Sequence, residues 1–182
     1  MNRLIKIFKR GPHYLKAYSK LSGDDIILVS FPKSGNTWVR NILVNYIGKN
    51  DLGKEIITFK ELDDTMPGLG TAVFFKPWNF SIPKFSSTHF KYFFFFRKTK
   101  NVLILRDPRD VMVSYFFYIN KKKNEYFFEN LYELLIHPEF GLENWFKHTI
   151  SWYKNVDFII VYEELLEADT SIIKMMFQKF NV

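Results

Sequence analysis

The 182-residue sequence contains no cysteine, which excludes disulfide bonds and metal sites built on thiolates. It also has no apolar run near the roughly 20 residues that a membrane-spanning helix needs. Its N-terminal segment alternates basic and apolar side chains and lacks the uninterrupted apolar stretch of a signal peptide. No cluster of metal-ligating side chains is evident either. We therefore expect no transmembrane segment, no bound metal and a cytoplasmic location.

Glycine and proline are also sparse, with eight and seven residues, and no internal repeat or low-complexity linker divides the chain. A length of 182 residues, with 47% hydrophobic and 25% charged residues, fits one globular domain with a buried core. Residues 1–23 form a basic lead-in in which Leu4, Ile5 and Phe8 recur at helical spacing. We expect it to pack as a helix on a domain formed by residues 24–182. Docking on a membrane surface is the alternative, less favoured because the segment is short.

The charge is unbalanced, with 26 basic and 19 acidic residues and a formal net charge of +7. A basic surplus suits an anionic partner, which could be a nucleotide, a nucleic acid or a lipid surface. A nucleic-acid-binding module needs basic residues clustered on one face. The only run of that kind is Lys121–Lys123, which is more typical of a solvated helix end. No nucleic-acid partner is expected.

Apolar runs alternate with segments of helical periodicity. Three such runs of strand length predict buried strands, at Ile26–Phe31, Asn101–Arg106 and Phe158–Tyr162, and a further strand is proposed at Phe85–Phe90. Helices are predicted at residues 37–47, 59–63, 110–120, 142–153 and 169–180. Strands that alternate with helices indicate an α/β fold with a central, mostly parallel sheet flanked by helices.

The segment between the first strand and its helix, Pro32–Asn36, has the chemistry of a phosphate-binding loop. A helix N-terminus presents unpaired N–H donors, and Gly35 allows the backbone to approach an anion closely. Lys33 adds a positive charge, while Ser34 and Thr37 add hydroxyl donors. An ordinary surface turn is the alternative. The loop lacks the G-x-x-x-x-G-K-[ST] pattern, which disfavours a P-loop nucleotide kinase.

A second candidate anion site follows the strand at residues 101–106. Arg106 can form a bidentate, charge-assisted pair with a phosphate at the strand end. Ser114 lies about two turns into the helix that follows. The alternative is an isolated surface charge and an incidental serine, but two such segments in one chain favour phosphate binding.

Both segments resemble motifs of sulfotransferases of the cytosolic type. Phe31–Trp38 is similar to the family's 5′-phosphosulfate loop, Tyr-Pro-Lys-Ser-Gly-Thr-Thr-Trp, and departs from it at Phe31 and Asn36. Arg106–Tyr115 is similar to the family's 3′-phosphate motif, Arg-Asn-Pro-Lys-Asp-Val-x-Val-Ser-Tyr. The resemblance spans residues 24 to about 180 and implies a P-loop-like three-layer fold. It also implies 3′-phosphoadenosine 5′-phosphosulfate (PAPS) as sulfuryl donor.

The resemblance implies a role for each matched residue. Lys33 would reach the oxygen that bridges sulfur and phosphorus, and Arg106 and Ser114 would bind the 3′-phosphate. Trp38 would stack on adenine, and Tyr162, in a segment similar to the family's Tyr-Glu-Asp-Met, would contribute to the adenine pocket. The implied donor-binding residues are Lys33, Ser34, Gly35, Asn36, Thr37, Trp38, Arg106, Ser114 and Tyr162.

His89 is the candidate general base. The family places its base in a Lys-Thr-His strand at this point, whereas here Ser87 replaces the lysine. A group that titrates near neutral pH suits removal of a hydroxyl proton. The three other histidines, His13, His137 and His148, are interpreted as structural.

The implied reaction moves a sulfuryl group from PAPS to a hydroxyl or amine of a small-molecule or glycan acceptor, with Lys33 and His89 as catalytic residues. Residues 48–82 and Phe93–Phe96 are expected on the acceptor side, with Phe74, Phe75 and Trp78 as pocket wall or as ordinary core. A nucleotide-binding remnant without turnover and a P-loop nucleotide kinase are the alternatives. The sequence does not define the oligomeric state.

The family continues after the last helix into a glycine-rich loop, approximately Arg-Lys-Gly-x-x-Gly-Asp-Trp, that closes over the donor. Nothing in the 182 residues matches that loop. We therefore expect the chain alone to be catalytically impaired, because the donor would lose charge-assisted contacts and stay open to water.

Overall fold

The computed structural model describes residues 15–121, 126–166 and 171–182. Four strands, β1 (Ile26–Ser30), β2 (Phe85–Thr88), β3 (Lys100–Leu105) and β4 (Phe158–Val161), form one sheet. The helices are α2 (Asn36–Asp51), α3 (Phe59–Thr65), α4 (Pro108–Lys121), α5 (Leu131–Ile136), α6 (Leu142–Tyr153), α7 (Tyr162–Leu166) and α8 (Ser171–Phe180), with 3₁₀ helices at Val73–Phe75 and Phe94–Lys98.

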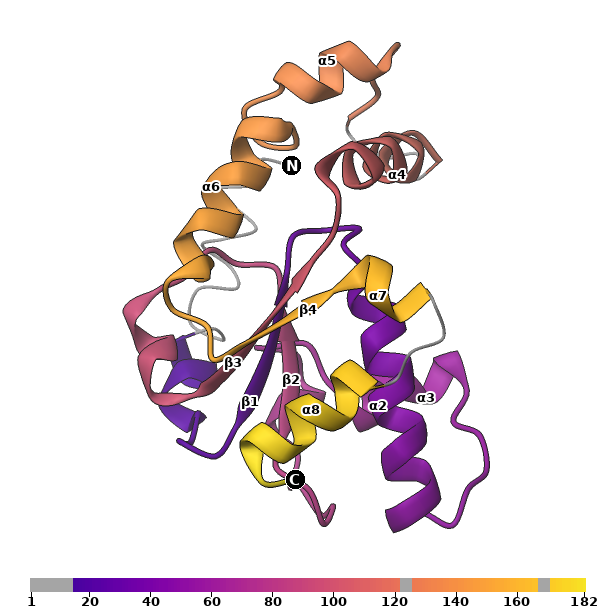
Figure 1. Cartoon of the computed structure of the whole chain (residues 1–182), viewed down its shortest axis with the longest axis vertical. Coiled ribbons are helices and arrows are strands. Elements are labelled where there is room, and N and C mark those ends of the chain that lie inside the picture. Colours follow the sequence, from indigo (N-terminus) through magenta and orange to yellow (C-terminus); the bar gives the residue numbers. More distant parts are fainter. Residues whose placement is uncertain (1–14, 122–125, 167–170) are drawn as a thin grey trace.

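The sheet has the strand order β2-β1-β3-β4, and every neighbouring pair is parallel (Figure 1). In the register of β1, Val29 pairs with Thr88 on one side, and Ser30 pairs with Ile104 on the other. The segments that follow β1, β2 and β3 therefore leave the sheet at the same edge. This confirms the predicted α/β fold with a parallel central sheet.

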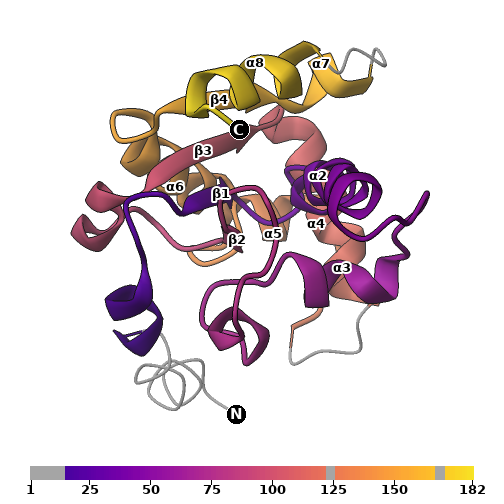
Figure 2. The same cartoon turned by 90° about the horizontal axis from the view of Figure 1, so that it is seen from below.

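Helices cover both faces of the sheet, because the apolar strands bury alternate residues on opposite sides. Ile26 and Leu28 belong to a core formed with α2, α3 and α8, whereas Ile27 and Val29 belong to one that includes Trp152 of α6. Figure 2 shows the short helix at residues 15–20 on the side of the sheet away from α8. The result is a three-layer arrangement.

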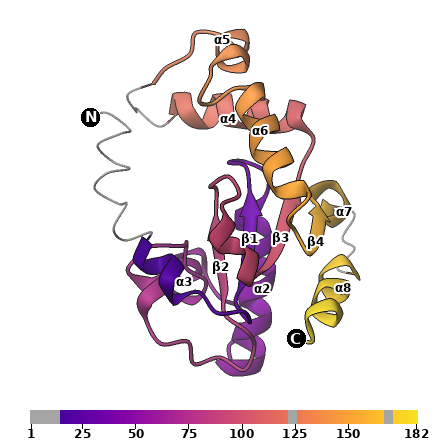
Figure 3. The same ribbon diagram turned by 90° about the vertical axis from the view of Figure 1, so that its left-hand side faces the viewer.

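A third apolar cluster lies beyond the strand ends, where α4, α5 and the first turns of α6 gather (Figure 3). It is built around Phe31, Val111 and Met112. Pro108 opens α4 at a position where its missing N–H costs nothing. Asp107, just before it, accepts a hydrogen bond from the backbone N–H of Arg109 at 2.8 Å, as a helix cap does.

Some predicted elements need correction. Tyr162 begins α7 and does not end β4, β2 stops at Thr88, and neither α5 nor α7 was predicted. Both helices are short, and α5 is capped by Asn130, whose side chain accepts the backbone N–H of Glu133 at 3.1 Å. None of the helices in the described ranges is both long and apolar enough to cross a membrane.

The proposed lead-in can be followed only from residue 15. Leu4, Ile5 and Phe8 lie outside the described residues, as do Lys122 and Lys123. Ala17 and Leu21 are buried in the same cluster as Phe96 and Trp152. The domain boundary at residue 23 stays a prediction.

We predict that Asn101→Ala lowers the free energy of unfolding by about 1–3 kcal/mol, because it removes the donor of two buried carbonyl groups. Asn101 Nδ2 donates to the carbonyls of Phe96 and Thr99 at 2.9 and 3.0 Å, where the chain enters β3. Asn50→Ala, which removes an exposed bond to the Tyr46 carbonyl, is the control and should change little. Equal urea midpoints for the two variants would contradict the prediction.

Candidate functional site

Three segments meet at the carboxyl edge of the sheet: the loop after β1, the residue after β2 and the residues after β3. In parallel sheets, ligands commonly bind in the crevice outside the carboxyl ends of the strands. Because Val29 pairs with Thr88, His89 emerges beside Ser30; because Ser30 pairs with Ile104, Arg106 emerges beside the loop. The sheet register thus brings together residues that lie far apart in the sequence.

The loop after β1 has the backbone of an anion-binding turn. Lys33 and Gly35 both have positive φ, 72° and 96°, so the chain turns tightly before α2 begins at Asn36. Alternation of right- and left-handed residues points successive N–H groups into one concavity. Ser34 and Asn36 are buried, and Nδ2 of Asn36 has no hydrogen-bond partner within the described ranges. A buried donor left over at a helix N-terminus is suited to an anion.

Gly35 lies directly under the ring of Tyr162, the first residue of α7. A Cβ built at position 35 would overlap two ring carbons of Tyr162. The guanidinium group of Arg106 lies over the same ring, 4.5 Å from its centroid. Tyr162 therefore packs between the loop and Arg106, and only glycine at position 35 leaves room for it.

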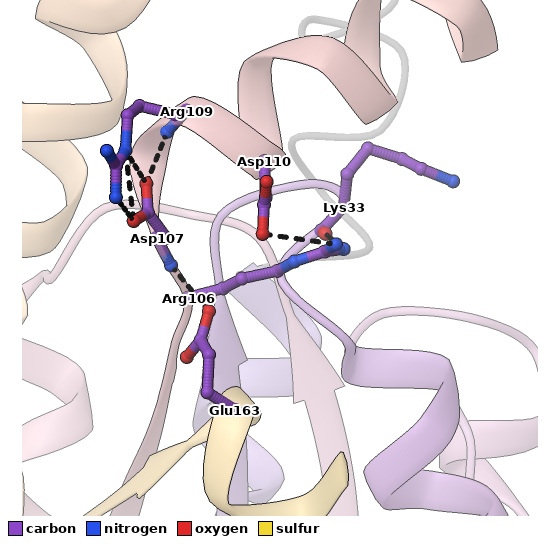
Figure 4. A network of polar contacts seen from close by, with 6 residues as sticks. All are labelled: Lys33, Arg106, Asp107, Arg109, Asp110 and Glu163. Atoms are coloured by element: carbon purple, nitrogen blue, oxygen red, sulfur yellow. Dashed lines mark hydrogen bonds and ion pairs between the residues drawn. The ribbon is translucent and has the colours of Figure 1, made fainter.

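Arg106 spans the gap between β3 and the loop. Its Nη1 donates to the carbonyl of Lys33 at 3.1 Å, and its Nη2 lies 4.0 Å from a carboxylate oxygen of Asp110 (Figure 4). Its Nε is buried and has no hydrogen-bond partner among the residues that the structure describes. The Lys33 side chain points away from Arg106, and its ammonium lies over the Tyr118 ring on α4, 4.5 Å from the centroid.

Asp107, which follows β3, is hydrogen-bonded to both α4 and α7. It receives hydrogen bonds from the side chain and backbone of Arg109, and its own N–H donates to Glu163 of α7 at 2.9 Å (Figure 4). The bonds from Arg109 hold the pKa of the Asp107 carboxyl at about 2. The carboxylate is therefore ionised, and Arg109 balances its charge beside Arg106.

His89 is held from the end of β1. Its Nδ1 lies 2.8 Å from the carbonyl oxygen of Ser30 and 3.1 Å from the Ser30 hydroxyl. A carbonyl only accepts, so Nδ1 carries the proton and, in the neutral ring, Nε2 keeps its lone pair. Desolvation lowers the pKa of His89, the Ser30 carbonyl opposes this, and the charge of Arg40 adds to the lowering. The ring is therefore neutral at pH 7.

A cavity of about 1010 Å³ opens beside His89. Eight of its 19 lining residues are Phe or Tyr and eight are polar, so aromatic and polar groups share the wall. The aromatic residues are Tyr18, Phe31, Phe90, Tyr92, Phe93, Tyr115, Tyr126 and Phe140, and the polar ones are Thr71, Ser87, Thr88, His89, Lys91, Glu139, Asn144 and His148. Phe93 and Thr71 come from the segments expected on the acceptor side, and that assignment stays a prediction. Phe74 and Phe96 are buried in the core instead, and Trp78 lines a separate pocket of about 310 Å³.

Residues 23–178 match the model of the sulfotransferase domain family. The chain belongs to this family. It is 27% identical over 159 residues to mouse sulfotransferase 2A2, covering 81% of this chain and 55% of that protein. It is 28% identical over 161 residues to dog sulfotransferase 1B1, covering 79% and 54%. The chain thus spans about 55% of the length of curated relatives that it matches.

Solved structures with a similar fold include mouse sulfotransferase SULT7A1 complexed with PAP, with a TM-score of 0.65, 24% identity, and coverage of 93% of this chain and 63% of that one. Another is retinol dehydratase in complex with androsterone and PAP, with a TM-score of 0.57, 18% identity, and coverage of 93% and 64%. These likenesses support the predicted P-loop-like fold.

The sulfotransferase domain brings most of the sequence-predicted residues to one edge. Lys33 to Asn36, Arg106 and Tyr162 are joined by the contacts described above, and His89 lies at the end of the neighbouring strand. Thr37 and Trp38 are exposed on the first turn of α2, and Ser114 is half-buried in the second turn of α4. Within the described residues, no hydrogen bond joins Ser114 to Arg106. The roles of these residues stay predictions.

The sequence did not predict the contacts of Glu163 and Tyr118 at the site, or that His148 borders the cavity. Glu163 lies next to Tyr162 in the matched segment, so that segment offered a signal. His148 was interpreted as structural; it is 2% exposed and lines the cavity. Neither ring nitrogen of His148 has a partner with good hydrogen-bond geometry within the described residues, although the backbone of Phe90 lies close enough to stabilise the charged ring. Burial is the largest cause that lowers its pKa to about 4, and the nearby His89 contributes.

We predict that Gly35→Ala lowers stability by about 1–3 kcal/mol more than Gly53→Ala, because a Cβ at position 35 overlaps Tyr162. Both glycines have positive φ, 96° and 61°, so both variants carry backbone strain, but nothing lies within 4 Å of a Cβ at position 53. Chemical denaturation of the two variants isolates the packing contribution. Equal losses of stability would show that Tyr162 moves aside freely.

Proposed function

We propose that this domain transfers a sulfuryl group from PAPS to a hydroxyl or amine of a small acceptor. The observation that carries the proposal is the linkage at the end of β1. Ser30 holds the neutral His89 through its carbonyl, and the anion-binding loop starts two residues later, at Pro32. The end of β1 thus positions both a candidate base and a candidate binding loop for the sulfuryl donor.

The chain's own residues fit a donor with two separated phosphate groups. Two buried donors that have no partner in the described part of the chain, Nδ2 of Asn36 and Nε of Arg106, belong to different segments of the site. Lys33, Ser34, Gly35, Asn36 and Thr37 would bind the 5′-phosphosulfate end. Arg106 and Ser114 would bind the 3′-phosphate, and Trp38 and Tyr162 would contact adenine. Similar folds solved with PAP support this donor.

In this proposal the protein supplies proton transfer and charge stabilisation. Nε2 of His89, kept free by the Nδ1–H bond to Ser30, takes the proton of the acceptor. Lys33 and the loop amides stabilise the charge that develops on the departing phosphate. Lys33 must first leave the face of Tyr118, a contact worth about 1 kcal/mol or less at an exposed site.

The eight Phe and Tyr residues of the cavity wall favour a small acceptor with an apolar body over a glycan, and the polar residues beside them would orient its hydroxyl or amine. The absence of a nucleic-acid partner, the cytoplasmic location and the need for a further C-terminal segment stay predictions.

Arg106→Ala should weaken binding of adenosine 3′,5′-bisphosphate by about 10- to 100-fold, because a charge-assisted hydrogen bond contributes about 1.5–3 kcal/mol. Binding of adenosine 5′-monophosphate should change little, so the preference between the two nucleotides should shrink. Arg97→Ala, at an exposed position of a 3₁₀ helix, is the matched control. Calorimetric titration with both nucleotides and ATP measures this. Equal affinity of the unaltered chain for all three would contradict the assignment and the sulfotransferase proposal.

His89→Ala should lower turnover by about 10²–10⁴-fold, the range for loss of a general base. Affinity for adenosine 3′,5′-bisphosphate should stay the same, which serves as the internal control for folding. In the unaltered chain, turnover should fall on acidification only below about pH 6.5, because the lowered pKa of His89 keeps the ring neutral above that point. Near-normal turnover in the variant would remove His89 from the mechanism.

A further inference from the structure

The backbone that follows His89 has no regular secondary structure before the 3₁₀ helix that begins at Phe94. It borders the cavity through Phe90, Lys91 and Tyr92. Such a segment needs hydrogen-bond partners from elsewhere, because buried backbone groups are rarely left unpaired. The Thr88 hydroxyl accepts the N–H of Phe90 at 3.2 Å, and two further partners come from one face of α6.

Two side chains of α6 hold this segment. The indole Nε1 of Trp152 donates to the carbonyl of Phe90 at 2.8 Å, and the hydroxyl of Ser151 accepts the backbone N–H of Tyr92 at 3.1 Å. The Ser151 hydroxyl itself donates to the His148 carbonyl at 2.7 Å, so its orientation is fixed. Trp152 is fully buried, and its ring meets that of Tyr92 edge-on at 5.1 Å.

His148 lies one turn before Trp152 on the same face of α6, so α6 also carries the second imidazole of the cavity. Spacing of three and four residues places His148, Ser151 and Trp152 on one side of a helix. His89 is therefore held from two directions: by Ser30 at its ring, and by α6 through the backbone that follows it.

We propose that Trp152 and Ser151 are positioning residues for His89: by fixing residues 90–92, they keep Nδ1 of His89 on the Ser30 carbonyl and Nε2 free toward the cavity. The consequence for catalysis rests on the proposed function, whereas the positioning itself does not. If the indole or hydroxyl is removed, the segment loosens and water reaches the imidazole.

The charged surroundings of His89 define what loosening should do. Arg40 of α2 contributes a positive charge and pairs with Asp63 of α3 at 2.6 Å, and His148 of α6, whose pKa is about 4, is neutral at pH 7. Desolvation is the largest cause of the lowered pKa of His89 and outweighs the opposing bond to the Ser30 carbonyl. Greater access of water therefore raises the pKa of His89 toward the value of about 6.5 for a solvated histidine, even where the bond to Ser30 also weakens. The pH below which turnover falls is then higher than in the unaltered chain.

A purely structural role for Trp152 predicts something different. Replacing a buried indole would lower thermal stability, and it would leave the titration of His89 unchanged once the protein is folded. The two accounts therefore differ in the protonation of His89, which can be measured directly.

The experiment is a pH titration of the histidine ring carbons by NMR, with the His89 signal assigned from its absence in His89→Gln. Trp152→Phe keeps a buried ring and deletes the N–H; Ser151→Ala deletes the hydroxyl with little loss of volume and serves if Trp152→Phe does not fold. Trp145→Phe is the matched control, since Trp145 is on α6 but packs in the cluster with α4 and α5.

We expect a raised pKa of His89 in Trp152→Phe and in Ser151→Ala, none in Trp145→Phe, and restoration in Ser151→Thr. Turnover in the two positioning variants should fall by about 3- to 10-fold, the equivalent of one neutral hydrogen bond, with unchanged affinity for adenosine 3′,5′-bisphosphate. An unshifted pKa in both variants overturns the proposal, even if they are less stable. Absence of sulfuryl transfer by the unaltered chain would count against the proposed function alone, because the NMR result does not depend on activity.

Discussion

The register of β1 between its two parallel neighbours determines the candidate site. Val29 is level with Thr88, and Ser30 is level with Ile104, so the residues that follow all three strands emerge at the same height. A slip of one residue along β2 would move His89 away from the Ser30 carbonyl and turn Phe85 to the other face of the sheet. Phe85 is fully buried in the core formed with α2, α3 and α8, so such a slip is costly. The packing of one aromatic side chain in β2 therefore helps to set the distance between the candidate base and the anion-binding loop.

The predictable features of the fold are those set by local chemistry. Continuous apolar runs identified β1, β3 and β4, whereas β2, with the sequence Phe-Ser-Ser-Thr, has no such run. The chemistry of Pro32–Asn36 identified the turn into α2. The short helices were missed because α7 has five residues and α5 has six, too few for a strong periodic signal. Their stability depends on packing partners distant in sequence. Tyr162 illustrates this: it follows an apolar strand and was predicted as its last residue, but the loop at Gly35 provides the surface on which its ring packs.

The candidate site was predictable in its residues but not in their connections. The sequence indicated Arg106 as an anion ligand and said nothing of its bond to the Lys33 carbonyl or its contact with Tyr162. These contacts matter physically, because an arginine held in advance loses less conformational entropy when an anion arrives. Asp107 would oppose such an anion if its charge were unbalanced, and Arg109 pairs with it in a fork of hydrogen bonds. Charge balance of this kind depends on side-chain directions, which sequence spacing alone does not define.

The histidines show why residue type is a weaker guide than surroundings. His89 and His148 both border the cavity, and desolvation is the largest cause of lowered pKa in each. They differ in what holds the ring: Nδ1 of His89 donates to the Ser30 carbonyl at 2.8 Å, whereas the ring of His148 interacts only weakly with the backbone of Phe90 within the described residues. A base needs one nitrogen fixed and the other open, which favours His89 of the two. The open nitrogen can accept a proton efficiently only if the ring keeps its orientation. The backbone that follows His89 must therefore be held in place as well. In the positioning that we propose, α6 meets that requirement through the indole of Trp152 and the hydroxyl of Ser151, which fix the backbone that follows the candidate base.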